Sequence, residues 1–219
     1  MSSSGASLPP AVVRRHLSAP RLAPYSAACS GDFDRAVALY RWNASVSAAL
    51  WEVVGHGEII LRNAIHDALT ERHRLSGAPG TWFDDPRHEL ERRALDDIAA
   101  ARRRVGRTTS DPLPGKIVAE LSFGFWRYLL ARRYSATLWP AVRHSFPHLP
   151  RGGRNDLERA VIHLHLLRNR IAHHEPLIRE DLQARLADLA FVLDAVSPVV
   201  RTWALDDGGR LSELLADEG

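Results

Sequence analysis

Hydrophobic residues recur every three or four positions from Asp32 to about residue 76, a spacing that predicts an amphipathic helix. Asp32 is a suitable N-cap at its start, and Pro79-Gly80 interrupts the pattern after its end. The stretch is predicted as one long helix or two shorter ones. The hydrophobic positions that set the rhythm are Val46, Leu50, Val53, Ile60 and Ala64.

Four further helices are predicted, each with a proline or a capping residue near a boundary. Asp85-Pro86 supplies a cap and an N1 proline for the first of them. Pro198 predicts a kink or break in the last. No strand, hairpin or repeat pattern appears, so the predicted fold class is all-α. The four helices cover residues 87–104, about 114–129, about 155–174 and about 181–204.

The chain is expected to form one all-α domain over residues 32–206. Residues 1–31 contain no acidic side chain and several prolines, which favours an extended N-terminal arm over a targeting helix. Residues 207–219 form an acidic C-terminal tail. A cytoplasmic location is the default expectation.

The composition is that of a globular, soluble protein. Of the 219 residues, 45% are hydrophobic and 25% are charged, and no apolar run is long enough to span a bilayer. Cys29 is the only cysteine, which excludes an intrachain disulfide and a cysteine-based metal cage. Lys116 is the only lysine among 29 basic residues, and the others are arginines, the side chain best shaped to contact phosphate.

Charge is unevenly distributed although the formal net charge is only +3. Residues 115–154 contain seven basic side chains and one acidic one, whereas residues 175–219 contain ten acidic and four basic ones. The basic segment has either an anionic partner or acidic partners within the chain, and both interpretations stay open. The arginine run of residues 102–107 is likewise either an RNA-backbone contact or a helix C-terminus favoured by the dipole.

Arg168 falls where the helical pattern expects a hydrophobic residue. On a helical wheel it lies inside the stripe formed by the apolar positions of the helix over residues 155–174. A guanidinium does not escape desolvation by losing its proton, so Arg168 needs a partner. The alternatives are a carboxylate such as Glu58 or Glu120, a carbonyl, an interface or an anionic ligand.

Two histidines follow Arg168 just before Pro176 ends this helix. Asn169 and His173 are one turn apart, so the amide is predicted to orient the imidazole of His173. Arg168 and His173 lie about 140° apart on an ideal helix. Convergence of the two on one point therefore requires a loosened last turn, the reach of the arginine or a second subunit.

The spacing of Arg168-Asn169, three residues and His173 resembles the signature of HEPN-domain ribonucleases. Further blocks are similar to the Abi-like branch, associated with abortive infection of phage-infected bacteria, and the resemblance covers roughly residues 10–205. It implies a HEPN-like helical bundle, a homodimer whose two motifs meet in a cleft, and metal-independent cleavage of RNA. The blocks are Tyr40-Arg-Trp42-Asn43, Gly55-His-Gly-Glu58, Leu61-Arg62-Asn63, Leu121-Ser-Phe-Gly-Phe-Trp126 and Arg170-Ile-Ala-His-His-Glu-Pro176.

The residue types suit this chemistry. His173 is assigned as the principal acid or base, since histidine exchanges protons near neutral pH. Arg168 is assigned to the phosphate oxygens and Asn169 to orienting His173. Arg170 and His174 are expected as further RNA contacts. No cofactor or metal is expected, and the expected partners are RNA, a second copy of the chain and an RNA or protein antitoxin, with no membrane.

Other interpretations compete with this one. Glu58, Arg62 and His66 form one i, i+4 row, which is either a self-satisfied polar ladder or a support for the catalytic site. His163 and His165 point about 200° apart on a helix, so they border the core or the dimer face and do not chelate one metal ion. The aromatic block 123–126 favours core packing over base stacking. The alternative function is a noncatalytic HEPN-type module that binds RNA or protein and dimerises.

Overall fold

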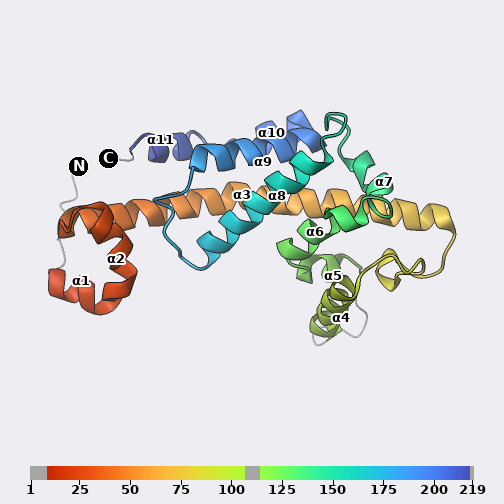
Figure 1. Cartoon of the computed structure of the whole chain (residues 1–219), viewed down its shortest axis with the longest axis horizontal. Coiled ribbons are helices and arrows are strands. Elements are labelled where there is room, and N and C mark those ends of the chain that lie inside the picture. Colours follow the sequence, from red (N-terminus) through yellow and green to blue (C-terminus); the bar gives the residue numbers. More distant parts are fainter. Residues whose placement is uncertain (1–8, 107–113, 218–219) are drawn as a thin grey trace. The chain divides into compact units, whose positions relative to one another are not determined.

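Eleven α-helices and no strand occur in residues 9–106 and 114–217, the parts of the chain that the computed structural model describes (Figure 1). The all-α prediction is confirmed. The chain divides into two compact units, of which the first consists of Met1–Trp51, Arg170–Glu180 and Gly208–Gly219, and the second of Glu52–Asn169 and Asp181–Asp207. The sequence predicted a single domain over residues 32–206. The boundary between the units at Trp51 lies inside the first long helix, where the hydrophobic pattern continues without a break and gives no sign of it.

The long N-terminal hydrophobic pattern forms one helix, α3, over Phe33–Ser76. Asp32 caps its start, since its Oδ1 accepts a hydrogen bond from Arg35 N at 3.0 Å. Gly57 lies inside this helix because a larger residue would not fit there. A Cβ at this position would lie 2.5 Å from Leu189 Cδ1. A neighbouring helix therefore packs closely against this point of α3.

The first unit contains α1 (Pro10–Leu17), α2 (Ala19–Ala28), the start of α3 and α11 (Arg210–Ala216). The extended arm predicted for residues 1–31 is therefore wrong over residues 10–28. Pro10 and Pro20 fall in the first turns of α1 and α2, where helices tolerate them, and α2 accommodates Pro24 in its interior. Residues 1–8 of that arm and 218–219 of the acidic tail lie outside the described residues.

Aromatic packing joins α2 to α3 inside the first unit. The rings of Tyr25 and Tyr40 meet edge to face with centroids 5.4 Å apart, and Cys29 is buried beside Tyr25. The acidic tail contains α11, which is joined to α3 by a hydrogen bond from Trp42 Nε1 to Leu214 O at 2.8 Å. Tertiary contacts thus hold α2 and α11 against α3 in this unit.

The second unit starts its next helix later than predicted. Asp85 adopts a left-handed conformation with φ of 47°, and its carboxylate accepts hydrogen bonds from Glu89 N and Leu90 N. These contacts hold a turn, so α4 covers Arg92–Gly106 and not residues 87–104. The Asp85-Pro86 pair, expected to begin a helix, instead belongs to that turn.

The other three predicted helical ranges are largely helical, but two of them are divided by capping serines that the sequence had not singled out. Ser122 accepts a hydrogen bond from Phe125 N, which divides the predicted third helix in two. Pro198 marks a true break, with Ser197 as the cap of the following helix. The helices are α5 (Pro114–Glu120), α6 (Phe123–Leu129), α7 (Trp139–Val142), α8 (Arg154–Ala172), α9 (Leu182–Val196) and α10 (Pro198–Ala204).

The aromatic block of α6 belongs to the core of the second unit, as predicted. Phe123, Phe125 and Trp126 are buried. Gly124 permits close approach of α8, because a Cβ there would lie 3.2 Å from His165 Nε2. Lys116, the single lysine, lies exposed on α5. None of the described helices is both long and apolar enough to cross a membrane.

Candidate functional site

Arg168 lies on α8 next to an otherwise buried apolar stripe. Its Nε donates a hydrogen bond to Glu58 Oε2 of α3 at 3.3 Å. Of the two partners predicted for it, Glu58 is therefore confirmed, while Glu120 pairs with Arg104 at 2.6 Å. The Arg168 side chain keeps 32% of its surface exposed, so this ion pair is not a buried one. The guanidinium is thus oriented by Glu58 and still reaches solvent.

Asn169 contacts the preceding turn of α8. Its Nδ2 lies 3.3 Å from His165 Nε2, whose ring also meets Phe123 edge to face. Burial lowers the pKa of His165, and the positive charges of Arg127, Arg168 and Arg93 lower it further. A neutral imidazole can accept a hydrogen bond from the Asn169 amide. The sequence predicted His173 as the partner of this amide, whereas the structure places it beside His165.

The C-terminal end of α8 forms a Schellman cap. Glu175 N donates to Arg170 O at 2.8 Å, and His174 N donates to Ile171 O at 3.0 Å. His174 takes the left-handed position of this cap with φ of 54°, where glycine is the usual residue. His173 and His174 are both exposed. The cap therefore presents two imidazoles at the end of the helix.

Contacts within the first unit fix the segment after this cap. Arg170 Nη1 donates to Pro176 O at 3.2 Å, and its Nε lies 3.2 Å from Glu180 Oε1. Arg21 Nη1 donates to His174 O at 2.5 Å. Leu177 N donates to the buried Asn43 side chain at 2.7 Å. Arg170, predicted as an RNA contact, thus holds the turn that follows α8.

The boundary between the two units falls inside the predicted motif. Arg168 and Asn169 belong to the second unit, with Glu58. Arg170, His173 and His174 belong to the first. The two halves of the predicted motif therefore belong to different units.

The row of Glu58, Arg62 and His66 is not a self-satisfied ladder. Glu58 pairs with Arg168, Arg62 Nε lies 3.4 Å from Asn63 Oδ1, and His66 Nδ1 accepts from Trp82 Nε1 at 3.0 Å. Burial lowers the pKa of His66, in keeping with a neutral acceptor. The ladder prediction is wrong because tertiary partners compete for the outer two side chains. Glu58 connects this row to the predicted motif through Arg168.

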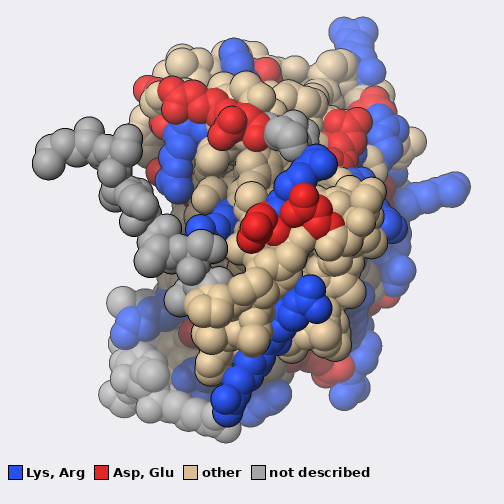
Figure 2. Space-filling model, turned by 90° about the vertical axis from the view of Figure 1, so that its left-hand side faces the viewer, with Lys and Arg blue, Asp and Glu red and all other residues tan. Residues whose placement is uncertain are grey.

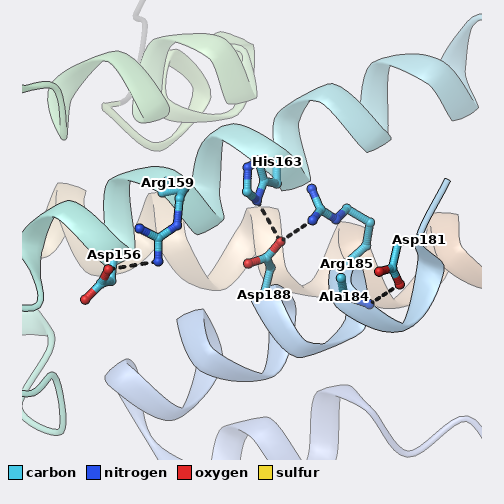
Figure 3. A network of polar contacts seen from close by, with 7 residues as sticks. All are labelled: Asp156, Arg159, His163, Asp181, Ala184, Arg185 and Asp188. Atoms are coloured by element: carbon cyan, nitrogen blue, oxygen red, sulfur yellow. Dashed lines mark hydrogen bonds and ion pairs between the residues drawn. The ribbon is translucent and has the colours of Figure 1, made fainter.

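His163 joins α8 to α9 (Figure 3). Its Nδ1 lies 2.9 Å from Asp188 Oδ2, and Arg185 approaches the same carboxylate at 3.3 Å. Sequence spacing gave no signal for this network, since Asp188 lies on another helix. In the described ranges of the chain, no group of three or more His, Cys, Asp or Glu side chains is arranged to hold a metal ion.

Ion pairs occupy the arginine run at the end of α4. Arg102 contacts Asp84 at 2.6 Å, and Arg104 contacts Glu120 at 2.6 Å. Arg107 of the same run lies outside the described residues. Figure 2 shows acidic and basic side chains interspersed over one face of the molecule, with wide uncharged areas between them. Arg102 and Arg104 of the run are therefore paired with acidic side chains of the same unit.

Comparison with known proteins gives no match: no family model, no curated protein and no solved structure matches this chain. The described helices establish the all-α class. The function has to be argued from the chemistry of the residues themselves.

Proposed function

We propose that this protein is a metal-independent endoribonuclease of the HEPN type, similar to the Abi-like proteins of abortive infection. One observation carries the proposal. Arg168 is a solvent-reaching guanidinium fixed by Glu58, and it precedes, by five positions, an exposed histidine at the end of the same helix. Both residue types at this spacing match the signature that the sequence resembles.

The reaction needs a base, an acid and a cation. In the proposed step a base removes the proton of a ribose 2′-hydroxyl, and the 2′-oxygen attacks the adjacent phosphorus. The bond from phosphorus to the 5′-oxygen breaks, and an acid protonates this leaving oxygen. The products carry a 2′,3′-cyclic phosphate and a 5′-hydroxyl. Histidine supplies such proton transfers near neutral pH, typically for a factor of about 10² to 10⁴.

Each candidate residue has one role in this proposal. His173 transfers protons, and Arg168 binds the nonbridging phosphate oxygens, whose negative charge grows in the transition state. Glu58 restricts the orientations of the Arg168 guanidinium. Arg62 and Asn169 support this arrangement, and His174 contacts RNA beside the cleaved bond. Arg170 acts mainly through the turn that it holds.

A second copy of the chain supplies the second proton-transfer group. The family resemblance implies a homodimer, and exposed apolar side chains on α3 support one. Trp51 is 47% exposed and Ile59 is 45% exposed, so both present apolar surface that a second copy would bury. An activity against cellular RNA also requires restraint, for which we propose an RNA or protein antitoxin.

The test is cleavage of RNA by the purified full-length chain in the presence of EDTA. We expect Arg168→Ala and His173→Ala each to lower the cleavage rate at least about 100-fold, the scale of a lost acid–base or oxyanion contact. Arg159→Ala is the matched control, because Arg159 is an exposed arginine of α8 paired only with Asp156 in Figure 3. The product ends should carry a 2′,3′-cyclic phosphate, measured by mass spectrometry.

The rival function is a noncatalytic HEPN-type module that binds RNA or protein and dimerises. The ion pairs of Arg168 with Glu58 and of Arg170 with Glu180 favour it, because they give both arginines a structural role. Wild-type protein that dimerises and binds RNA without cutting it would establish the rival. Equal cleavage by wild type and both alanine variants would also contradict the assigned site.

A further inference from the structure

The second unit contains a positively charged cavity of about 650 Å³ at the start of α8. Its lining includes three arginines and two aromatic rings, and the chain supplies no acidic residue between Leu121 and Arg154. The side chains that matter here are Trp139, Arg143, Phe146, Arg151 and Arg154. This cavity is the place in the described part of the basic segment where cations gather around an open space.

Two of the three arginines have no side-chain partner within the part of the chain that the structure describes. Arg154 is fixed, because it donates to Leu130 O at 2.9 Å and to Glu158 Oε2 at 3.0 Å. Arg143 and Arg151 are exposed and form no ion pair or side-chain hydrogen bond with any described residue. Two forked cations are therefore available for an anion that enters the cavity, with Arg154 as a fixed third positive charge.

The aromatic rings form one wall of the same cavity. Trp139 and Phe146 are stacked, with centroids 6.2 Å apart and planes at 19°. Phe146 is buried, whereas Trp139 is only partly buried. Phe146 thus supports one side of the indole, and the rest of the indole lines the cavity. A planar base stacks favourably on the face of such a ring.

Short-range backbone contacts hold these side chains in place. Gly153 N donates to Pro150 O at 2.9 Å, and His148 N donates to Ala195 O of α9 at 3.2 Å. Arg143 belongs to the 3-10 helix η3 (Arg143–Ser145), which directly follows α7. The cations and the aromatic wall therefore sit on ordered backbone.

We propose that this cavity binds the terminal phosphate of a nucleotide, with Arg143 and Arg151 on the phosphate and the base against Trp139. The source is either a free mononucleotide or the phosphorylated end of an RNA strand, which present the same group. The site is separate from Arg168, because Arg154 and Arg168 lie fourteen positions apart on α8, or about 21 Å. Binding here does not depend on the proposed cleavage reaction.

The experiment is calorimetric titration of the full-length chain with AMP, adenosine and inorganic phosphate at low salt. We expect AMP to bind at least about tenfold more tightly than either of its parts, because only AMP uses both the arginines and the indole. The double variant Arg143→Gln, Arg151→Gln should weaken AMP binding at least about tenfold. Trp139→Leu should weaken binding of AMP and leave that of phosphate unchanged.

Arg103→Gln is the matched control, since Arg103 is an exposed arginine of α4 outside the cavity. It should leave AMP binding unchanged. Equal weakening by this control would overturn the proposal in favour of general charge attraction. Failure of AMP to bind better than phosphate would overturn the nucleotide assignment. Circular dichroism of each variant verifies its helix content.

The two sources are distinguished with short RNA strands in the Arg168→Ala background. A strand with a 5′-phosphate that binds through Arg143 and Arg151, while its 5′-hydroxyl counterpart does not, identifies an RNA end. Tight binding of AMP with no gain from the 5′-phosphate on RNA identifies a free nucleotide. Loss of both interactions contradicts the site, whatever the outcome of the cleavage assay.

Discussion

Both ends of α8 have arginines, but the arginines at the two ends differ in their partners. At the C-terminal end, Arg170 is engaged by Glu180 and by Pro176 O, and the helix is closed by a left-handed histidine. At the N-terminal end, Arg151 has no side-chain partner among the described residues, and the turn before the helix uses glycine. The number of arginines alone does not distinguish a binding surface from a structural contact. The presence or absence of carboxylates beside each arginine makes this distinction.

The tight turn at the N-terminal end gives the larger stability effect. Gly153→Ala places a Cβ 2.9 Å from Pro150 O, so backbone has to shift. We expect a loss of about 1–3 kcal/mol in the free energy of unfolding, measured by urea denaturation. Gly55→Ala is the control, because nothing lies within 4 Å of its added Cβ in the interior of α3. It should stabilise the protein by about 0.5–1 kcal/mol. Similar stability changes for both variants would contradict this packing.

The cap at the C-terminal end predicts a smaller change of opposite sign. His174→Gly removes the cost of a side chain at φ of 54°, and we expect a gain of about 0.5–1 kcal/mol in the free energy of unfolding. The adjacent His173→Gly lacks this benefit and should destabilise the helix end by a similar amount. Thermal and urea unfolding of both variants measure the contrast. Destabilisation by His174→Gly would show that the imidazole contributes more than the strain costs.

The middle of α8 predicts the smallest effect, a pH dependence of stability. Burial lowers the pKa of His165 in the folded state, so the unfolded chain binds this proton first as the pH falls. The stabilisation is fully present above the unfolded pKa of about 6.5 and is lost as the pH falls towards the folded pKa. Urea unfolding at pH 7.5 and 5.5 should show a smaller loss for His165→Gln than for wild type. Equal losses would contradict a half-buried, neutral imidazole at His165.

Local signals predicted the helices because their caps act over a few residues. Asp32, the predicted cap, begins α3 through a contact with its neighbour Arg35, and Pro198 marks the predicted break before α10. Asp85 misled the prediction, because its carboxylate holds a turn through Glu89 N and Leu90 N. A capping residue in the sequence therefore predicts that a helix boundary lies nearby. It does not by itself predict whether a helix begins directly after that residue.

The candidate site was only partly predictable, because its partners come from distant positions. The helical periodicity singled out Arg168 as a residue that needs a partner, and Glu58 was one of the two carboxylates named for it although it lies 110 positions away in the chain. The Asn169 contact with His165 competes with the predicted contact to His173, and a helical wheel treats both neighbours alike. The cavity of Arg143 and Arg151 had no motif at all. Its only advance sign was the acid-free stretch between Leu121 and Arg154.

The solitary exposed Lys116 on α5 has a practical consequence for labelling. Amine-reactive dyes and surface linkers modify lysine and the chain's α-amino group but leave arginine unchanged. Every side chain assigned above to RNA or nucleotide is an arginine, a histidine or Trp139, so such a reagent leaves the recognition groups unmodified. A fluorophore or an immobilising tether attached at Lys116 would therefore report binding by a protein with intact recognition groups.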